Sequence, residues 1–443
     1  MRKFLRRIER HHEEGNHVDA NGDIRDKYGA LVARGSAYHR RRRKPNNARS
    51  LEGLPVEIKV LILQNADLTG LKALVRASPS LHRVYRDHRQ AVLTQALRST
   101  LTDALLWEAR ELTVVGRWAG SGDPRSRSAS VAGFLVVYHA VRQGGVFPAE
   151  RIELRVLVPM VRYQLMIEAI AMQYSRAILA EHPVTGRKMA EFGALSGTEA
   201  RRIYRALYRF DLYCALFHVQ KRWPLDGRER WRRHYGVVPI SRFFLSKFAL
   251  WEVEEVACIA KYLLDQYNMY LRAAGHRDPE DVKKESSRQR RRSDDALNVR
   301  LTEKKDNCMA LGLTYFHSLS TAKQSQRQIA LAGSAVSDED SHLARALHGH
   351  HESQQHVHRA QGISAEMFHD VKFTGEAAGP NAGFLWSKGA KPWHFDRVNN
   401  AHRDWGYVFW DRGRLSEWGV LRQNRRTWRK EKELGLAGRL ISR

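Results

Sequence analysis

The chain of 443 residues is 43% hydrophobic and 9% aromatic, so it can bury a substantial core and is not a wholly disordered protein. Its 75 Lys and Arg residues against 48 Asp and Glu residues give a formal net charge of +27, which favours attraction to nucleic acid, anionic membrane surfaces or acidic proteins. The sequence has no uninterrupted apolar run of about eighteen residues, so we expect no membrane-spanning helix and no membrane partner.

The first residues and the cysteines predict an intracellular protein of the nucleus or the cytoplasm. The basic stretch Met1–Arg7 is followed by further charged residues, without the apolar centre of a secretory signal. Cys214, Cys258 and Cys308 lie far apart and are odd in number, which argues against a disulfide framework and a cysteine-built zinc site. We expect neither a metal nor another cofactor.

Residues 1–49 combine scattered hydrophobic residues with many charges and several glycines. Such a segment cannot bury enough apolar area to offset the entropy lost on ordering, so we predict a mostly disordered basic tail. It contains the basic run His39–Pro45, and a second run follows at Arg288–Arg292. Each run suits a nuclear-import or phosphate-binding role, or a solvated linker, and the composition leaves both open.

Hydrophobic residues recur at helical spacing from Leu51 onward, and a first short helix is predicted after Leu54. Pro55 suits the first helical position, where its missing amide costs nothing. Leu54, Ile58, Leu61 and Ile62 lie at i, i+4, i+7 and i+8 and form a broad apolar face. A helix this short needs a surface to pack on.

Two more short helices are predicted before residue 95. The second carries a leucine-rich stripe, and Pro79 separates it from a third helix that contains Leu81, Val84 and Tyr85. The stripe consists of Leu68, Leu71, Leu74 and Val75. Three short helices with more apolar surface than they can cover among themselves imply docking to a partner or burial under the rest of the chain.

The segment resembles the F-box, whose opening Leu-Pro-x-Glu-Ile and following Ile-Leu stand here as Leu54–Ile58 and Ile62–Leu63. The resemblance covers residues 50–95 and implies a three-helix domain that docks on the Skp adaptor protein. That adaptor is joined to a cullin and a RING subunit in an SCF ubiquitin ligase. We expect the Skp-binding residues to form an uncovered apolar surface; by position they are Leu54, Pro55, Ile58, Ile62, Leu68, Leu71, Leu74 and Val75.

Residues 96–430 are predicted to form an irregular α-helical, target-recognition domain, with long loops at about 276–300 and 334–361 and a basic tail at 431–443.

Ser196 and Glu199 have the spacing of a capping box, which marks the start of a helix. Its predicted core stripe is Ile203, Leu207, Phe210, Cys214 and Phe217, whereas Arg201, Arg202, Arg205 and Arg209 fall largely elsewhere on the helix. A second core helix carries Trp251, Val256, Ile259, Leu263 and Tyr267.

The body is also similar to a group of fungal F-box proteins of unassigned target. The resemblance rests on four short stretches: Leu195–Glu199, Tyr213–Phe217, Trp251–Glu254 and Gly406–Asp411. It supports a mainly α fold in which a short F-box precedes a helical body and an aromatic-rich C-terminal segment. It implies no particular target.

Six of the 11 tryptophans lie in the C-terminal segment, interleaved with arginines. Exposed rings beside guanidinium groups stack bases or capture a protein target, and on that interpretation the target-binding residues are Trp393, Trp405, Trp410 and Trp418. The alternative, which we favour, is that the segment wraps the body and buries its rings, because tryptophan contributes a large packing area.

The sequence offers little support for an enzyme. His394 and Asp396 form a His-x-Asp pair but lack a marked distal histidine for an iron site. The histidine-rich stretch His348–His358 does not have zinc-protease spacing, and no phosphate-loop, dinucleotide-binding or nucleophile-turn motif occurs. The favoured hypothesis is a non-enzymatic SCF adaptor with an unknown protein target. The alternatives are a basic nuclear nucleic-acid-binding protein and an F-box protein that acts outside a cullin ligase.

Overall fold

The computed structural model describes residues 50–118, 124–144, 152–189, 193–217, 244–245, 248–274, 308–333, 347, 382–388 and 400–423, and three short strands before residue 50. The strands β1 (His17–Val18), β2 (Ile24–Arg25) and β3 (Leu31–Ala33) pair as a small antiparallel sheet within the segment predicted as a tail. The loops predicted at 276–300 and 334–361, Leu347 apart, and the tail predicted at 431–443 lie outside the described residues. The described part is mainly helical, as the sequence predicts.

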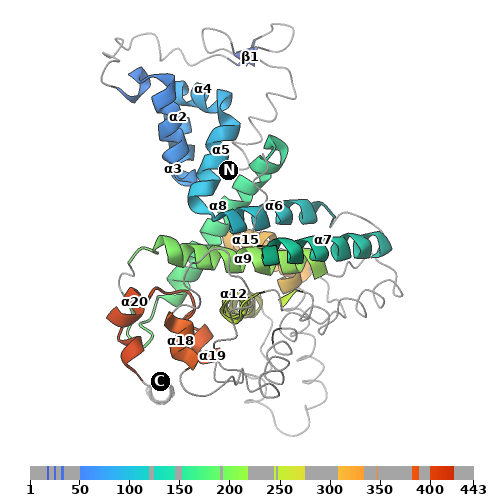
Figure 1. Ribbon diagram of the computed structural model, residues 1–443, viewed down its shortest axis with the longest axis vertical. Helices are drawn as coiled ribbons and strands as arrows, with labels where there is room; N and C mark the ends of the chain where they lie inside the picture. Colours follow the sequence, from blue (N-terminus) through green and yellow to red (C-terminus); the bar gives the residue numbers. More distant parts are fainter. Residues whose placement is uncertain are drawn as a thin grey trace.

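The helices after residue 50 form a small N-terminal module that stands at one end of the molecule (Figure 1). It consists of η3 (Leu51–Gly53), α2 (Val56–Asn65), α3 (Leu68–Ala77), α4 (Pro79–Asp87) and α5 (Arg89–Thr100). The three predicted short helices correspond to α2, α3 and α4, and α5 continues past the expected boundary at residue 95. Pro55 directly precedes α2, and its carbonyl accepts the Lys59 amide at 3.1 Å.

Side-chain caps fix the boundaries between the helices of this module. The Asp67 carboxylate accepts the Gly70 amide at the start of α3. The Ser78 hydroxyl accepts the Leu81 amide at 3.3 Å and donates to Glu52 Oε1 at 2.7 Å, so it caps α4 and connects that helix to η3. These bonds satisfy amides that a first helical turn leaves without an internal partner. They therefore set the angles at which the short helices meet.

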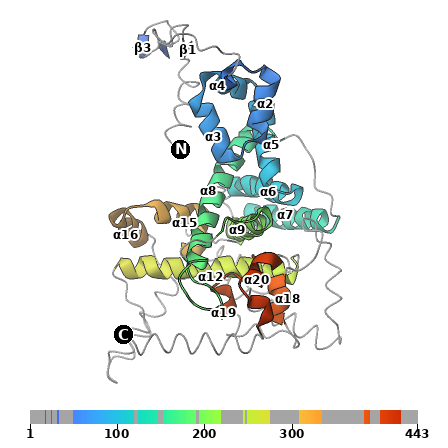
Figure 2. The same cartoon turned by 90° about the vertical axis from the view of Figure 1, so that its left-hand side faces the viewer.

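The body is built around two long helices that cross each other, α9 (Gly197–Phe217) and α12 (Leu250–Ala273). Figure 1 shows α9 along its length and α12 end-on, and Figure 2 reverses the two views. The helices of the body are α6 (Asp103–Trp118), α7 (Pro124–Gly144), α8 (Leu154–Ile178), α9 (Gly197–Phe217), α12 (Leu250–Ala273), α15 (Gly312–Thr321), α16 (Gln324–Gly333), α18 (Ala382–Lys388), α19 (Asn400–Arg403), α20 (Arg412–Glu417) and η6 (Val420–Arg422). Helix α8 reaches from the body to the N-terminal module, and α18 to α20 lie beside the crossing (Figures 1 and 2).

Helix α9 begins with the predicted capping box. The Ser196 amide donates to Glu199 Oε2 at 3.0 Å, and the Glu199 amide donates to Ser196 Oγ at 3.1 Å. Both predicted core stripes are confirmed, because every residue named for them on α9 and α12 is buried. The two stripes join one hydrophobic core that also includes α6, α8 and α15.

Candidate functional site

Apolar side chains of η3, of α2 and of the two residues between them form a face, which we call the α2 surface and define as Leu51, Leu54, Pro55, Ile58, Leu61 and Ile62. Leu51, Ile58 and Leu61 are 38%, 41% and 52% exposed, Pro55 is also exposed, and Leu54 and Ile62 are half-buried. The opposite side of the helix packs inward through Leu63, which is fully buried. One side of α2 thus packs on the rest of the N-terminal module, and the other side presents aliphatic side chains to solvent.

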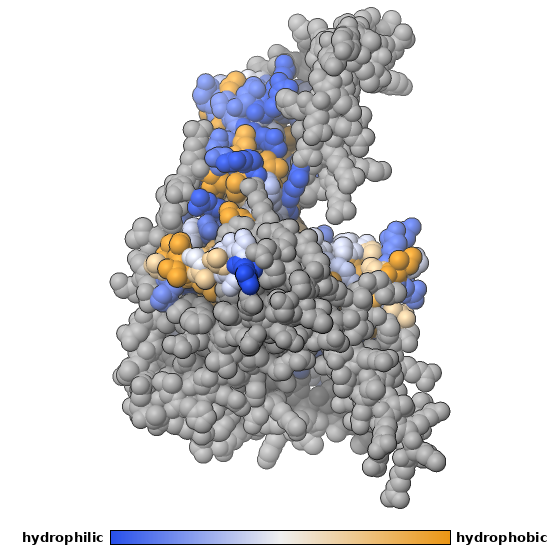
Figure 3. Space-filling model, turned by 90° about the vertical axis from the view of Figure 1, so that its right-hand side faces the viewer, coloured by the Kyte–Doolittle hydropathy of each residue, from blue (hydrophilic) through white to orange (hydrophobic). Residues whose placement is uncertain are grey.

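Figure 3 shows the face of the molecule that lies on the right-hand side of Figure 1. Orange hydrophobic residues lie among blue hydrophilic ones in the upper part of the molecule, where Figure 1 places α2 to α5. Scattered single apolar residues are normal on protein surfaces, but several on one short helix mark a candidate interaction site.

The second predicted stripe is not part of an uncovered surface, and this expectation was wrong. Leu68, Leu71 and Val75 are only 3%, 4% and 6% exposed, and Leu74 is half-buried. Helix α3 packs against α4 and also against α8, which comes from a position far along the sequence, and together they cover the stripe. Of the eight residues expected at a Skp interface, the structure therefore leaves Leu54, Pro55, Ile58 and Ile62 together on the accessible side, with Leu74 at the edge of the core.

Three of the C-terminal tryptophans are core residues. Trp405, Trp410 and Trp418 are 3%, 0% and 8% exposed, and Trp410 Nε1 donates to the Trp405 carbonyl at 2.8 Å. Trp418 also meets the ring of His182 edge-on. This matches the packing interpretation and corrects the alternative in which these rings capture a target. Trp393, the other ring proposed for that role, lies outside the described residues.

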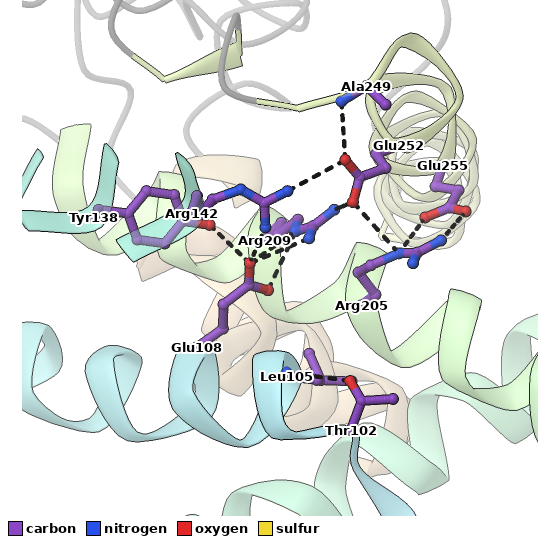
Figure 4. A network of polar contacts seen from close by, with 10 residues as sticks. All are labelled: Thr102, Leu105, Glu108, Tyr138, Arg142, Arg205, Arg209, Ala249, Glu252 and Glu255. Carbon is purple, nitrogen blue, oxygen red and sulfur yellow. Dashed lines mark hydrogen bonds and ion pairs between the residues drawn. The ribbon is translucent and has the colours of Figure 1, made fainter. Parts of the chain in front are cut away.

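A network of buried charges lies where α6, α7, α9 and α12 meet (Figure 4). Arg209 donates to Glu108 at 3.1 to 3.2 Å and also pairs with Glu252. Arg142 bridges the same two glutamates at 2.9 and 3.3 Å. Arg205 forms a two-pronged pair with Glu255 at 2.9 and 2.6 Å. Each buried charge therefore has an opposite charge within hydrogen-bonding distance.

The electrostatics of this network follow from its burial. Burial alone would raise the pKa of Glu252, but the positive charges of Arg209, Arg142 and Arg205 outweigh it and lower the pKa to about 2. Burial, followed by the charge of Glu108, raises the pKa of Tyr138, whose hydroxyl donates to Glu108 at 2.8 Å. At neutral pH Glu252 is therefore ionised and Tyr138 is neutral. Because they are paired and enclosed, the network joins helices and offers no accessible group for catalysis.

Three arginines of α9 are buried, which the sequence did not indicate. Arg202, Arg205 and Arg209 lie off the apolar stripe as expected, yet they are only 8%, 9% and 2% exposed. Helix α9 is therefore covered on nearly all sides. The signal that could have revealed two of the partners is the pair Glu252 and Glu255, which stand at i and i+3 in the apolar first half of α12.

Two further charged clusters fasten the C-terminal segment to the body. Arg414 Nε donates to Glu199 Oε1 at 2.7 Å, and Arg202 Nη1 donates to Asp411 Oδ1 at 2.8 Å. Arg403 donates to both oxygens of Glu254, at 3.1 and 2.9 Å. The carboxylate of the capping box thus also binds an arginine from the far end of the chain.

The described residues contain no group of three His, Cys, Asp or Glu side chains arranged to hold a metal ion. The His394/Asp396 pair, the histidine-rich stretch and both basic runs lie outside them. Cys214, Cys258 and Cys308 are buried free thiols. Among the helices that the structure describes, none combines the length and apolar character needed to cross a membrane.

Searches against protein-family models, curated proteins and solved structures found no match for this chain. The functional inference therefore depends on the residues and their geometry.

Proposed function

We propose that the chain is an F-box-type adaptor that binds a Skp adaptor protein through the α2 surface and carries a protein target on its helical body. The single observation that supports the proposal most is the exposure of Ile58 and Leu61, at 41% and 52%, on the helix that begins with the F-box-like Leu54–Ile58. Helix-mediated recognition uses apolar anchors at such i, i+3 and i+4 spacing. Assembly with a cullin and a RING subunit would follow through the Skp adaptor.

The arrangement of the module also supports this proposal. Helix α2 packs on α4 and α5 through its inner side, so its outer side keeps its shape without a partner. A preformed surface loses less conformational entropy on binding than a segment that must fold. The accessible patch is smaller than the resemblance implied, because α4 and α8 together cover the second stripe.

The test is co-purification of the full chain with a fungal Skp adaptor protein. A variant with Ile58→Asp and Leu61→Asp places two charges on the α2 surface and should abolish co-purification. The matched control is Ile329→Asp on α16, where an equally apolar side chain is 73% exposed on the body. Co-purification that survives the double substitution, or a wild-type chain that fails to bind any Skp adaptor, would contradict the proposal.

A cullin pull-down separates an SCF adaptor from a Skp-bound protein that acts outside a ligase. If the Skp adaptor co-purifies with the chain and a cullin does not, the proposed function becomes that of a Skp-bound protein that acts outside a ligase.

The nucleic-acid alternative is supported by the net charge of +27, and any phosphate contacts would have to come from basic residues that are not paired inside the fold. Several arginines are neutralised inside the fold, namely Arg142, Arg202, Arg205, Arg209, Arg403 and Arg414. Phosphate-dominated binding would weaken steeply between low and physiological salt, so a salt titration with duplex DNA distinguishes the two functions.

A further inference from the structure

A pocket lies where the N-terminal module meets α8, away from the outer side of α2. Its cavity volume is about 80 Å³, and its mouth is open to solvent. Its walls are mostly aliphatic and come from α3, α5 and α8; they include Leu68, Leu71, Val75, Leu93, Val161 and Leu165. Side chains that the F-box resemblance assigned to a protein interface thus line an internal pocket instead.

The polar residues of the pocket share one sign. Among the described residues that line it, the charged ones are Lys72, Arg89 and Arg162, and none is acidic. The Arg89 Nε is buried, and no hydrogen-bond acceptor within the described chain reaches it. A buried donor without an acceptor is costly, and a carboxylate suits a guanidinium because two parallel hydrogen bonds can form.

Two acidic residues are neighbours of lining residues along the chain. Asp67 directly precedes the lining residue Leu68, and Glu168 follows Leu165 by one helical turn. Burial raises the pKa of Glu168, and the charge of Asp67 raises it further. A bound anion would be attracted by Lys72, Arg89 and Arg162, which line the pocket themselves.

We propose that this pocket binds a small anionic amphiphile, a carboxylate that carries an aliphatic chain. The chain packs against the leucine and valine walls, and the carboxylate binds Arg89, with Lys72 and Arg162 adding positive potential. Because α3 and α5 belong to the N-terminal module and α8 to the body, the ligand contacts both and holds them together. The inference does not depend on Skp binding, and the chain alone is sufficient to test it.

The experiment is calorimetric titration of the purified full chain, without any adaptor, with decanoate below its micellar concentration. Decanol, which has the same chain length without the charge, is titrated in parallel. We expect saturable binding of decanoate and binding of decanol at least roughly tenfold weaker, because the charge-assisted bond to Arg89 is lost.

Two variants locate the site. Arg89→Gln should weaken decanoate roughly tenfold or more and bring it close to decanol, while Val161→Trp, which fills the pocket, should remove binding of both ligands. The control is Arg83→Gln, since Arg83 is exposed on α4 and does not line the pocket, and it should leave both affinities unchanged. Equal affinity for decanoate and decanol in the wild-type chain, or no saturable binding of decanoate, would overturn the proposal.

Discussion

Arg209 of α9 and Glu252 of α12 form an ion pair inside the protein, with Nη1 and Oε1 2.5 Å apart. The same Glu252 accepts the Ala249 amide at 2.8 Å, so the start of α12 is capped by the carboxylate that binds α9. The Phe248 ring lies against the guanidinium groups of both Arg209 and Arg142, at 4.5 and 5.0 Å. One carboxylate therefore fixes both where α12 begins and where it crosses α9.

Removing one partner of this network should be strongly destabilising. Glu108→Gln keeps the shape of the side chain but leaves Arg209 and Arg142 with an uncompensated buried charge, so we expect a loss of about 3–5 kcal/mol in the free energy of unfolding. Urea unfolding followed by circular dichroism measures it. Glu153→Gln is the control, because its pair with Arg155 is exposed and should contribute less than about 1 kcal/mol. Similar losses for both variants would contradict the assignment of the network to the core.

The pH dependence of stability follows from Glu252. Its pKa is about 2 in the folded protein against a usual value of 4.5, so it stabilises the fold above pH 4.5 and this contribution is lost as the pH falls toward 2. The full contribution is about 3 kcal/mol. The measurement is the difference in unfolding free energy between the wild type and Glu252→Gln from pH 7 to pH 3. The difference should shrink below pH 4.5, and a constant difference across that range would refute the explanation.

Gly406 should not tolerate a side chain. Its φ of 63° is in the left-handed region, and a Cβ would overlap the hydroxyl oxygen of Tyr174. Gly406→Ala should therefore cost about 2 kcal/mol or more, whereas Gly419→Ala, with a φ of 71° and open space around it, should cost only the backbone strain of about 1–2 kcal/mol. Thermal unfolding compares the two.

A second substitution separates overlap from strain at Gly406. The Tyr174 hydroxyl makes no hydrogen bond within the described chain, so Tyr174→Phe alone should cost little. Combined with Gly406→Ala, it should recover part of the loss, because the overlapping oxygen is gone. A purely additive double variant would show that the close approach to Tyr174 is not the cause.

Neighbouring residues of α2 should separate stability from binding. Leu63 is fully buried and Leu61 is 52% exposed. Leu63→Ala should cost about 2–5 kcal/mol of stability, while Leu61→Ala should stay within about 0.5 kcal/mol of the wild type. Under the proposed function, Leu61→Ala should nevertheless weaken the interaction with the Skp adaptor in a binding titration. A Leu61→Ala chain that is stable and binds normally would remove this residue from the interface.

The sequence predicted what depends on neighbours along the chain. The stripe from Ile203 to Phe217 and the reciprocal cap of Ser196 and Glu199 follow from helical periodicity and local hydrogen bonding, and both are present. The exposed side of α2, with Ile58 and Leu61, follows from the same periodicity. None of these required knowledge of distant residues.

What the sequence could not predict depends on contacts between distant segments. Arg209 lies off the predicted apolar stripe, and the sequence did not show that it would be buried, because its partners Glu108 and Glu252 come from helices far away in the chain. Leu71 was expected at a protein interface. Local spacing along the chain could not show that α8 would pack beside it. No motif in the sequence marks the pocket that α3, α5 and α8 form.

The contact of Arg414 and Asp411 with the start of α9 has a consequence for synthesis of the chain. Glu199 and Arg202 leave the ribosome more than two hundred residues before these partners do. Contacts between such distant residues form late, since a long loop must close first. A nascent chain that ends after α12 therefore has Glu199 and Arg202 in contact with water and part of its core uncovered. Chaperones bind such exposed apolar surface until the C-terminal segment has been synthesised.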